Sequence, residues 1–351
     1  MNADRREQMM HNDRTTVRAS RSVARETRAI PVRWGLIGCG DIARKRVAAA
    51  LSESPHSELI AISRANRDLL DEFGDAFRVP NRFADWRELV ARNDVDAVYI
   101  ATPVNLHAAQ TVAAAESGKH VLCEKPMALN VAECDRMLAA ANASGVKLGI
   151  AYYRQFYPVV KRMKELIDSG EIGKPIIAQV NAFEWFNPGP SNPRAWLLDP
   201  EISGGGPMFD FGCHRIQLLL HLLGRIKAVS AVRSTVLFQR EVEDTASASF
   251  EFTSGPIANV TVSHAVMSPG DSVTIWCSEG SIATEVLNEG RLLVRTRDKE
   301  RFEIHEPARN IHQPLIQDFV RAVIDERQPL VTGEIGKAVA EVEEEIYRHG
   351  C

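Results

Sequence analysis

The chain has 351 residues, which is long for a single hydrophobic core and predicts two domains. Hydrophobic residues make up 45% and charged residues 25% of the sequence, ordinary globular values that argue against a disordered or fibrous protein. The formal net charge is −4, and so mild an acidic balance argues against a nucleic-acid or membrane-surface partner.

The first thirty residues are polar and rich in arginine, and we expect residues 1–30 to form a disordered tail. No apolar run reaches the roughly 18 residues that a membrane-spanning helix needs. The six cysteines form no C-x-x-C pair, so neither a disulfide framework nor a zinc site is indicated, and we expect no metal. Reduced thiols of this kind predict a cytoplasmic protein.

Residues 31–153 alternate short apolar runs with helical segments. Alternation at this spacing builds βαβ units, so this part is predicted to be a doubly wound parallel Rossmann sheet. The predicted strands are 32–38, 59–63, 95–101, 119–123 and 146–152, and the predicted helices are 41–51, 106–117 and 131–143.

Residues 154–351 have a different rhythm, in which most strands follow one another without helices between them. Such a run predicts an α+β domain with a mostly antiparallel open sheet. One broad, partly apolar face of that sheet would be left for a second copy, so we expect a homodimer or homotetramer. The expected strands are 176–186, 227–234, 246–252, 258–263, 273–277, 281–285, 291–295 and 302–305; the expected helices are 159–169, 214–223, 313–325 and 334–348.

A glycine-rich turn follows the first predicted strand. Gly38, Gly40, Asp41 and Ile42, with Ala43, fit the pattern G-x-G-x-x-G/A between a strand and a helix. The first glycine permits the tight turn, the second admits a pyrophosphate close to the backbone, and the helix N-terminus attracts the phosphates. The turn therefore predicts dinucleotide binding.

The second predicted strand ends in Ser63-Arg64, where NAD-preferring proteins usually carry an acid for the ribose 2′-hydroxyl. An arginine there attracts a 2′-phosphate instead. We therefore expect NADP(H) to be preferred, with NAD(H) possible, unless Arg64 is an ordinary solvated charge.

Two polar segments follow later strands at the edge where parallel sheets bind ligands. The first contains Thr102, Pro103, Asn105 and His107. One interpretation is that they line the cofactor site and another that they form a turn in which Asn105 caps the next helix, and the two are compatible. The second is Glu124-Lys125-Pro126, and Glu124 and Lys125 are further candidates for the cofactor site.

Together, the glycine turn, Ala101-Thr102-Pro103, Glu124-Lys125-Pro126 and Gly204-Gly205-Gly206 followed by Asp210 and His214 resemble the glucose–fructose oxidoreductase / inositol dehydrogenase (Gfo/Idh/MocA) family. The resemblance spans residues 32–349. It implies that Lys125, Asp210 and His214 form the catalytic centre, with His214 exchanging the substrate hydroxyl proton while a hydride moves to or from the nicotinamide.

Residue chemistry suits these roles. Partial burial is expected to lower the pKa of Lys125 toward neutrality. If a helix begins at Asp210, this residue and His214 lie four apart on one face, as an acid/base histidine and its orienting carboxylate. The alternatives are a helix-capping Asp210 and a core His214.

Candidate substrate contacts are Asp210 and His214 together with Tyr153, Arg154 and Trp185, which lie after the last Rossmann strand or at the end of the first strand beyond it. Aromatic rings suit a sugar or cyclitol ring, although core packing explains Trp185 equally well. The predicted function is an NAD(P)-dependent oxidoreductase acting on a sugar, polyol or cyclitol. The alternatives are a cofactor-retaining glycosidase or sugar oxidoreductase, and a non-catalytic dinucleotide-binding regulator.

Overall fold

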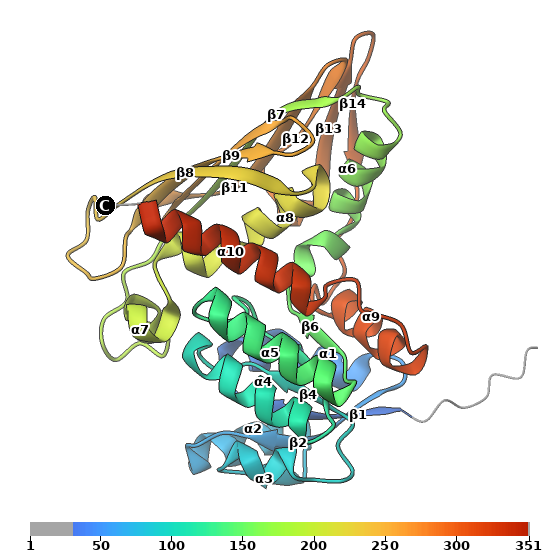
Figure 1. Cartoon of the computed structure of the whole chain (residues 1–351), viewed down its shortest axis with the longest axis vertical. Helices are drawn as coiled ribbons and strands as arrows, with labels where there is room; N and C mark the ends of the chain where they lie inside the picture. Colours follow the sequence, from blue (N-terminus) through green and yellow to red (C-terminus); the bar gives the residue numbers. More distant parts are fainter. Residues whose placement is uncertain (1–30, 350–351) are drawn as a thin grey trace, which may run out of the picture. The chain divides into compact units, whose positions relative to one another are not determined.

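The computed structural model describes residues 31–349, so the expected tail at residues 1–30 lies outside the described residues. These described residues group into one compact unit. Within it, two separate sheets organise the chain (Figure 1). The predicted boundary at 153/154 falls between the last strand of the first sheet and the first strand of the second, and stays a prediction.

The first sheet has six parallel strands in the order β3-β2-β1-β4-β5-β6, which confirms the Rossmann prediction. β4 is buried along its whole length, as expected for a strand covered on both faces. Its elements are β1 Val32–Ile37, η1 Ala43–Val47, α1 Ala48–Glu53, β2 Ser57–Ser63, α2 Arg67–Phe77, β3 Asn81–Phe83, α3 Trp86–Val90, β4 Ala97–Ile100, η2 Val104–Leu106, α4 His107–Glu116, β5 His120–Cys123, α5 Val131–Ser144 and β6 Leu148–Ile150.

The second sheet has eight strands in the order β14-β13-β12-β11-β7-β10-β9-β8. Every neighbouring pair is antiparallel except β7 and β10, which run parallel, so the mostly antiparallel prediction is confirmed. The strands are β7 Pro175–Trp185, β8 Ile226–Ser234, β9 Thr245–Phe252, β10 Ile257–Ser263, β11 Ala265–Cys277, β12 Gly280–Thr284, β13 Arg291–Thr296 and β14 Glu300–Ile304.

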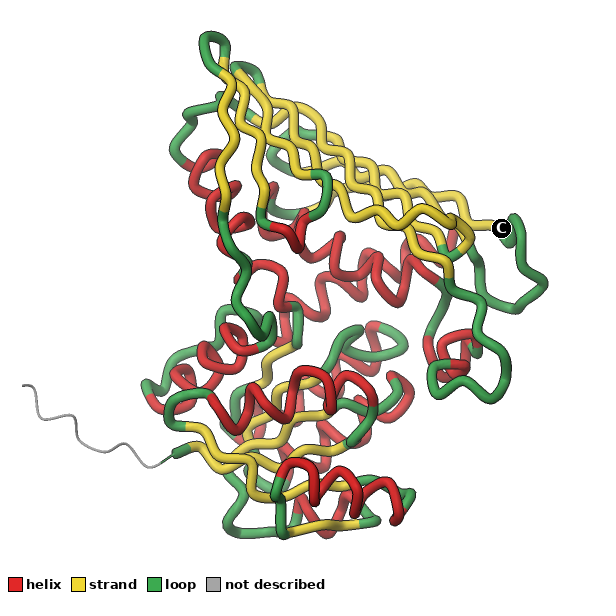
Figure 2. The backbone as a smooth tube through the Cα atoms, turned by 180° about the vertical axis from the view of Figure 1, so that it is seen from behind, coloured by secondary structure: helices red, strands yellow, loops and turns green. Residues whose placement is uncertain are grey.

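The helices of this half gather on one side of the larger sheet, as Figure 2 shows. Alternation along β9 explains why: its inward positions carry Ala and Phe, whereas its outward positions carry Ser, Thr and Glu. The helical segments are η3 Tyr153–Phe156, α6 Pro158–Asp168, η4 Ala195–Leu198, α7 Pro200–Ser203, η5 Met208–Gly212, α8 Cys213–Leu223, η6 Leu287–Glu289, α9 Gln313–Ile324 and α10 Gly333–His349.

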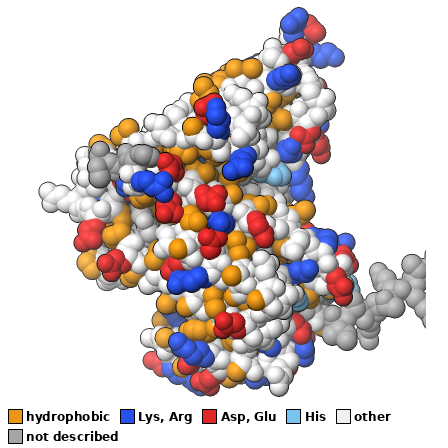
Figure 3. All heavy atoms as spheres, in the orientation of Figure 1, with side chains coloured by type: hydrophobic (Ala, Val, Ile, Leu, Met, Phe, Trp, Pro, Cys, Tyr) orange, Lys and Arg blue, Asp and Glu red, His pale blue; other side chains and the backbone are white. Residues whose placement is uncertain are grey.

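The last two helices return to the first sheet and join the two halves. α9 packs beside β1, where the Trp34 and Phe319 rings lie 5.5 Å apart. α10 contacts α5 on one side and α8 and β8 on the other. Acidic and basic side chains are mixed over the face of the molecule that Figure 3 displays.

Candidate active site

The glycine-rich turn lies where the first sheet reverses its strand order, between β1 and its neighbours β2 and β4. Gly38 has φ +93°, and a Cβ there would come within 2.6 Å of the Ala101 carbonyl carbon, so this position requires glycine. A Cβ on Gly40 would meet nothing within 4 Å. The open side of Gly40, at the start of a helix, is the space that a pyrophosphate needs.

Arg64 follows β2 and turns back over this glycine turn. Its Nη1 donates a hydrogen bond to the Cys39 carbonyl at 2.5 Å, and the Cys39 thiol faces the Ser63 carbonyl. Asp41 forms an ion pair with Lys45 one helical turn away, on the exposed side of the helix. Arg64 thus lies against the glycine turn at the end of β2.

The segment after β4 is tied together by side chains. Thr102 Oγ1 donates to Gln110 at 2.7 Å. The buried His107 ring lies 2.9 Å from the carbonyl oxygens of both Thr102 and Pro126. Burial lowers the pKa of His107 despite these two carbonyls. His107 therefore connects this segment to the Glu124-Lys125-Pro126 turn, and a neutral ring donates to only one carbonyl at a time.

The alternative of a helix cap at Asn105 is wrong. α4 has Leu106 at its N-cap position with no side-chain capping bond, and Asn105 is exposed. The short helix η2 continues into α4 instead, so the backbone turns without an Asx cap. Pro103 precedes η2 and is half-buried.

An ion pair joins the two halves of the site. Lys125 Nζ donates to the Asp210 carbonyl at 2.8 Å and to Asp210 Oδ1 at 3.1 Å. Both side chains are mostly buried. Burial opposes charge on each, yet the mutual attraction raises the pKa of Lys125 and lowers that of Asp210. The expected drop in the pKa of Lys125 is therefore wrong, because the carboxylate outweighs desolvation.

Glu124 supports this lysine from behind. Its carboxylate accepts from the Tyr99 hydroxyl at 2.8 Å and from the Lys125 backbone N–H at 3.2 Å. His312 Nε2 lies 3.6 Å away. Burial raises the pKa of Glu124, but His312, Lys125 and Tyr99 together hold it below its usual value. Glu124 is thus a buried anion that fixes the turn.

His214 lies in α8, buried, beside the rings of Tyr152 and Tyr153, whose centroids are 5.7 and 4.9 Å away. Its Nδ1 has no hydrogen-bond partner among residues 31–349. Burial, followed by the charges of Lys125 and Arg154, lowers the pKa of His214 well below its usual value. The ring is therefore neutral near pH 7.

The expectation that Asp210 orients His214 is also wrong. Asp210 lies inside the π-helical segment Met208–Gly212, which precedes α8, and His214 Nδ1 has no hydrogen-bond partner among residues 31–349. The Asp210 carboxylate pairs with Lys125 and, at 3.8 Å, with Arg194.

The candidate substrate contacts fall in different places. Tyr153 lies between His214 and His312, with ring centroids 4.9 and 4.4 Å away. Arg154 is buried in an ion pair with Asp271 at 2.8 Å, so its guanidinium is already engaged. Trp185 is 47% exposed and contacts Phe238 on the outer face of β7. Of these three candidates, Tyr153 is the one with a ring contact to His214.

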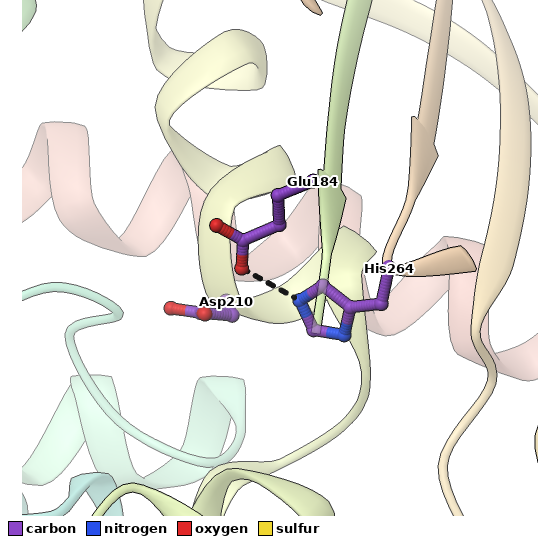
Figure 4. Close-up of side chains that lie close together, drawn as sticks. All are labelled: Glu184, Asp210 and His264. Atoms are coloured by element: carbon purple, nitrogen blue, oxygen red, sulfur yellow. Dashed lines mark ion pairs between the residues drawn. The ribbon is translucent and has the colours of Figure 1, made fainter. Parts of the chain in front are cut away.

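Three residues that the sequence reasoning missed stand beside Asp210. Glu184 in β7, His264 between β10 and β11, and Arg194 in the loop before α7 surround its carboxylate. Figure 4 shows Glu184, Asp210 and His264 converging. Period-two alternation along β7, whose Ala178, Val180 and Ala182 are buried, places Glu184 on the inner face; no comparable signal marks His264.

Glu184, Asp210 and His264 are the one carboxylate–histidine group near metal-binding geometry in residues 31–349, with ligand atoms within 4.8 Å of one another. Two observations make them a poor fit to a cation. Arg240 lies 3.1 Å from His264 Nδ1 and can only donate, so the neutral ring carries its hydrogen on Nε2, the nitrogen that faces the carboxylates. In addition, the Asp210 carboxylate already forms an ion pair with Lys125.

Comparisons with known proteins agree with this geometry. Residues 32–152 match the family described as "Oxidoreductase family, NAD-binding Rossmann fold", and residues 160–283 match the GFO/IDH/MocA C-terminal domain. The chain belongs to the Gfo/Idh/MocA oxidoreductase family. The resemblance seen in the sequence is confirmed, and so is its implication of a dinucleotide-binding oxidoreductase.

Relatives with named activities cover most or part of the chain. The 1,5-anhydro-D-fructose reductase of Ensifer adhaerens is 30% identical, over 87% of this chain and 92% of the relative. A D-xylose 1-dehydrogenase [NADP(+)] of Haloarcula marismortui is 32% identical over 60% of this chain and 59% of its own.

Solved structures extend the likeness to the fold. The aldose-aldose oxidoreductase of Caulobacter crescentus, complexed with glycerol, has a TM-score of 0.84 at 27% identity, covering 91% of this chain and 97% of its own. A levoglucosan dehydrogenase in complex with NADH and L-sorbose has a TM-score of 0.83 at 25% identity, covering 91% and 96%.

Among the described residues, no helix combines the length and apolar character that crossing a bilayer requires.

Proposed function

We propose that this family member transfers a hydride between a nicotinamide cofactor and a CH–OH carbon of a sugar, polyol or cyclitol, and that Lys125 and His214 are its catalytic residues. The observation that carries the proposal is that the pKa values of Lys125 and His214 are shifted in opposite directions. The Asp210 carboxylate raises the pKa of Lys125, whereas burial lowers that of His214. One residue is thus a cation and the other a neutral base at the same pH.

This division assigns the proton steps. The Lys125 ammonium donates a hydrogen bond to the substrate oxygen and stabilises the negative charge that develops there. The neutral His214 imidazole accepts the hydroxyl proton when the alcohol is oxidised and returns it when the carbonyl is reduced. Asp210 is a positioning residue, because its contact at 3.1 Å holds Lys125 in place.

The dinucleotide fits the residues present. The open space at Gly40 and the helix that follows suit the pyrophosphate, and a bound nicotinamide would accept or supply the hydride. We further propose that NADP(H) is preferred, since Arg64 lies over the glycine turn with no carboxylate paired to it in residues 31–349. The NADP(+)-dependent relative supports this choice; the NADH complex of a structural neighbour weighs against it.

Two measurements test this function. Purified protein is first titrated with NADPH and NADH by nicotinamide fluorescence, comparing Arg64→Asp with the control Arg67→Asp, whose exposed side chain pairs with Asp71. We expect only Arg64→Asp to weaken NADPH binding. Equal or tighter NADH binding by the native chain would refute the NADP preference alone.

The second measurement follows absorbance at 340 nm with D-glucose, D-xylose or myo-inositol as reductant and 1,5-anhydro-D-fructose as oxidant. Lys125→Met and His214→Phe should each lower kcat/KM by about 10²–10⁴-fold while cofactor binding persists. A native chain that binds the dinucleotide yet turns over none of the four would contradict the proposed reaction. Cofactor retained through purification would instead favour the cofactor-retaining alternative.

Assembly and location complete the proposal. The outer face of the larger sheet exposes Ile177, Trp276, Val232 and Ile257, each at least 40% accessible, and we assign this face to contact with a second copy. Sedimentation showing only monomer at micromolar concentration would overturn the assignment. The described cysteines are free thiols, which supports a cytoplasmic location.

A further inference from the structure

Glu184 stands at the rim of the site rather than at its centre. Its side chain is 40% exposed, and that of Arg194 on the other flank of Asp210 is 43% exposed. Asp210 and Lys125 are only 14% and 18% exposed. Side-chain exposure thus decreases from Glu184 and Arg194 to the Lys125–Asp210 ion pair. When an oxygen of the substrate contacts Lys125, the adjacent groups of the substrate therefore lie near Glu184.

The carboxylate of Glu184 is held from one side. Arg240 Nη2 donates to His264 Nδ1 at 3.1 Å, which leaves the hydrogen of the neutral ring on Nε2. That nitrogen lies 3.4 Å from Glu184 Oε1, and both atoms are buried without any closer partner in the described chain. His264 Nε2 therefore presents a donor to Oε1; the dashed line in Figure 4 joins the His264 ring to the Glu184 carboxylate.

The other oxygen of Glu184 remains available. Oε2 makes no hydrogen bond with residues 31–349 and is not among their buried unpartnered atoms, although Oε1 is. An anionic oxygen at a half-open rim is a strong acceptor for a hydroxyl hydrogen. Glu184 belongs to the group whose ligand atoms come within 4.8 Å of one another around Asp210, and Asp210 contacts Lys125, so one small molecule is able to contact both Glu184 and Lys125.

We propose that Glu184, positioned by His264, binds a second hydroxyl group of the substrate, on the carbon next to the one that reacts. The proposal rests on the proposed function and narrows its substrate class to vicinal diols: sugars, polyols or cyclitols with a free hydroxyl beside the reacting CH–OH. Glu184 is thereby a specificity-determining residue, and it takes no part in moving the hydride or the reacting proton.

A divalent cation is the competing occupant of the same group. Binding it through His264 Nε2 would require the ring to move its hydrogen to Nδ1, against the guanidinium of Arg240. It would also place a second positive charge beside Lys125, which already contacts Asp210. The observations therefore favour a hydroxyl group over a metal ion.

The test compares a vicinal diol with its deoxy analogue, using D-glucose against 2-deoxy-D-glucose or, if myo-inositol is the better substrate, its monodeoxy analogues. In the native chain we expect kcat/KM to favour the parent by about 10- to 100-fold. Glu184→Ala should reduce that preference to about 2-fold, mainly through KM of the parent. Glu184→Gln keeps an acceptor oxygen and should retain part of the preference.

Controls make the outcome decisive. Glu201 is an exposed carboxylate in α7, and Glu201→Gln should leave kcat/KM for both substrates unchanged. Thermal melting and NADPH titration verify that each variant is folded. Glu184 variants that lower kcat/KM equally for the parent and the deoxy substrate, or that leave the preference for the parent unchanged, would overturn this proposal. The proposed oxidoreductase function would still stand. Activity that EDTA abolishes and Mg²⁺ or Mn²⁺ restores only when Glu184 is present would overturn it in favour of a metal site. A native chain inactive on every diol refutes the function itself and this proposal with it.

Discussion

Replacing Glu343 with methionine should stabilise the protein. Glu343 lies in the middle of α10, between the buried Val339 and Ile346 of the same helix face, and is itself only 1% exposed. Neither of its carboxylate oxygens has a hydrogen-bond partner in residues 31–349. Burial raises the pKa of Glu343 well above its usual value, and the charge of Lys125 only partly opposes this shift.

The size of the effect follows from the orphaned carboxyl group. A buried polar group without a partner costs about 1–3 kcal/mol, and Glu343→Met removes it while keeping the side chain unbranched. A cavity of about 100 Å³ lined by Glu343, Phe209 and Tyr347 leaves room for the larger thioether. We expect the free energy of unfolding at pH 7 to rise by about 1–3 kcal/mol.

The gain should also depend on pH in a fixed direction. The folded-state pKa of Glu343 is raised above its usual value of 4.5, so the native chain has its full stability below that pH and loses some as pH rises toward the folded-state pKa. The advantage of Glu343→Met must therefore be larger at pH 8 than at pH 5.

Urea unfolding at the two pH values, followed by fluorescence and circular dichroism, measures this difference. Glu344→Met is the matched control, since the neighbouring Glu344 is exposed and its replacement should change stability by less than about 0.5 kcal/mol. The reasoning would be refuted if Glu343→Met lowered the free energy of unfolding, or if it raised that free energy by the same amount at pH 5 and at pH 8.

Three further changes probe the fold and the site. Gly38→Ala would place a Cβ 2.6 Å from a backbone carbonyl carbon at a φ of +93°, and NADPH titration should show binding lost; unchanged affinity would contradict the assigned turn. Asp271→Asn leaves two buried arginines without their shared partner and should cost about 3–5 kcal/mol in urea unfolding, so a cost below about 1 kcal/mol would argue against the pair. Because burial lowers the pKa of His214, the stability that depends on its neutral form is present above pH 6.5 and lost as pH falls below it; His214→Gln should flatten the acid side of the unfolding midpoint between pH 5 and pH 6.5, and an unchanged slope would refute this.

Strong local patterns made most of the fold predictable. The apolar runs that became β1, β4 and β5 are short and continuous, and each is followed within three residues by a glycine or a proline. These features predicted both that they are strands and that they belong to the first sheet. The segment α2–β3–α3, residues 67–90, was missed because its apolar positions are sparse and its charged residues dominate. β11 is longer than expected. The sequence pattern begins this strand at Val273, whereas the structure begins it at Ala265, with an irregular register between Ala265 and Gly270 where it pairs with β7.

The sequence predicted the residues Lys125, Asp210 and His214 of the candidate site, but not the contacts between them or the directions of their pKa shifts. Lys125 and Asp210 are 85 positions apart, and no periodicity reveals that their side chains meet. The direction of the pKa shift of Lys125 depends on that contact, so burial alone gave the wrong sign. The π-helical turn at Met208–Gly212 likewise has no simple sequence signal, and the Asp210 carboxylate within it pairs with Lys125 and Arg194.

The pairing that the sequence concealed also simplifies the mechanism. A lysine tuned toward neutrality would compete with His214 for the hydroxyl proton, and either residue would then serve as base. With Asp210 at 3.1 Å the ammonium keeps its proton, because passing it to the carboxylate would oppose both shifted pKa values. Only the neutral His214 then remains as acceptor, so loss of Asp210 should do more than loosen Lys125. In Asp210→Asn the pKa of Lys125 should fall, and the alcohol-oxidation profile should acquire a second titration on its alkaline side; an Asp210→Asn profile with the native shape would mean that the carboxylate does not set the charge of this lysine.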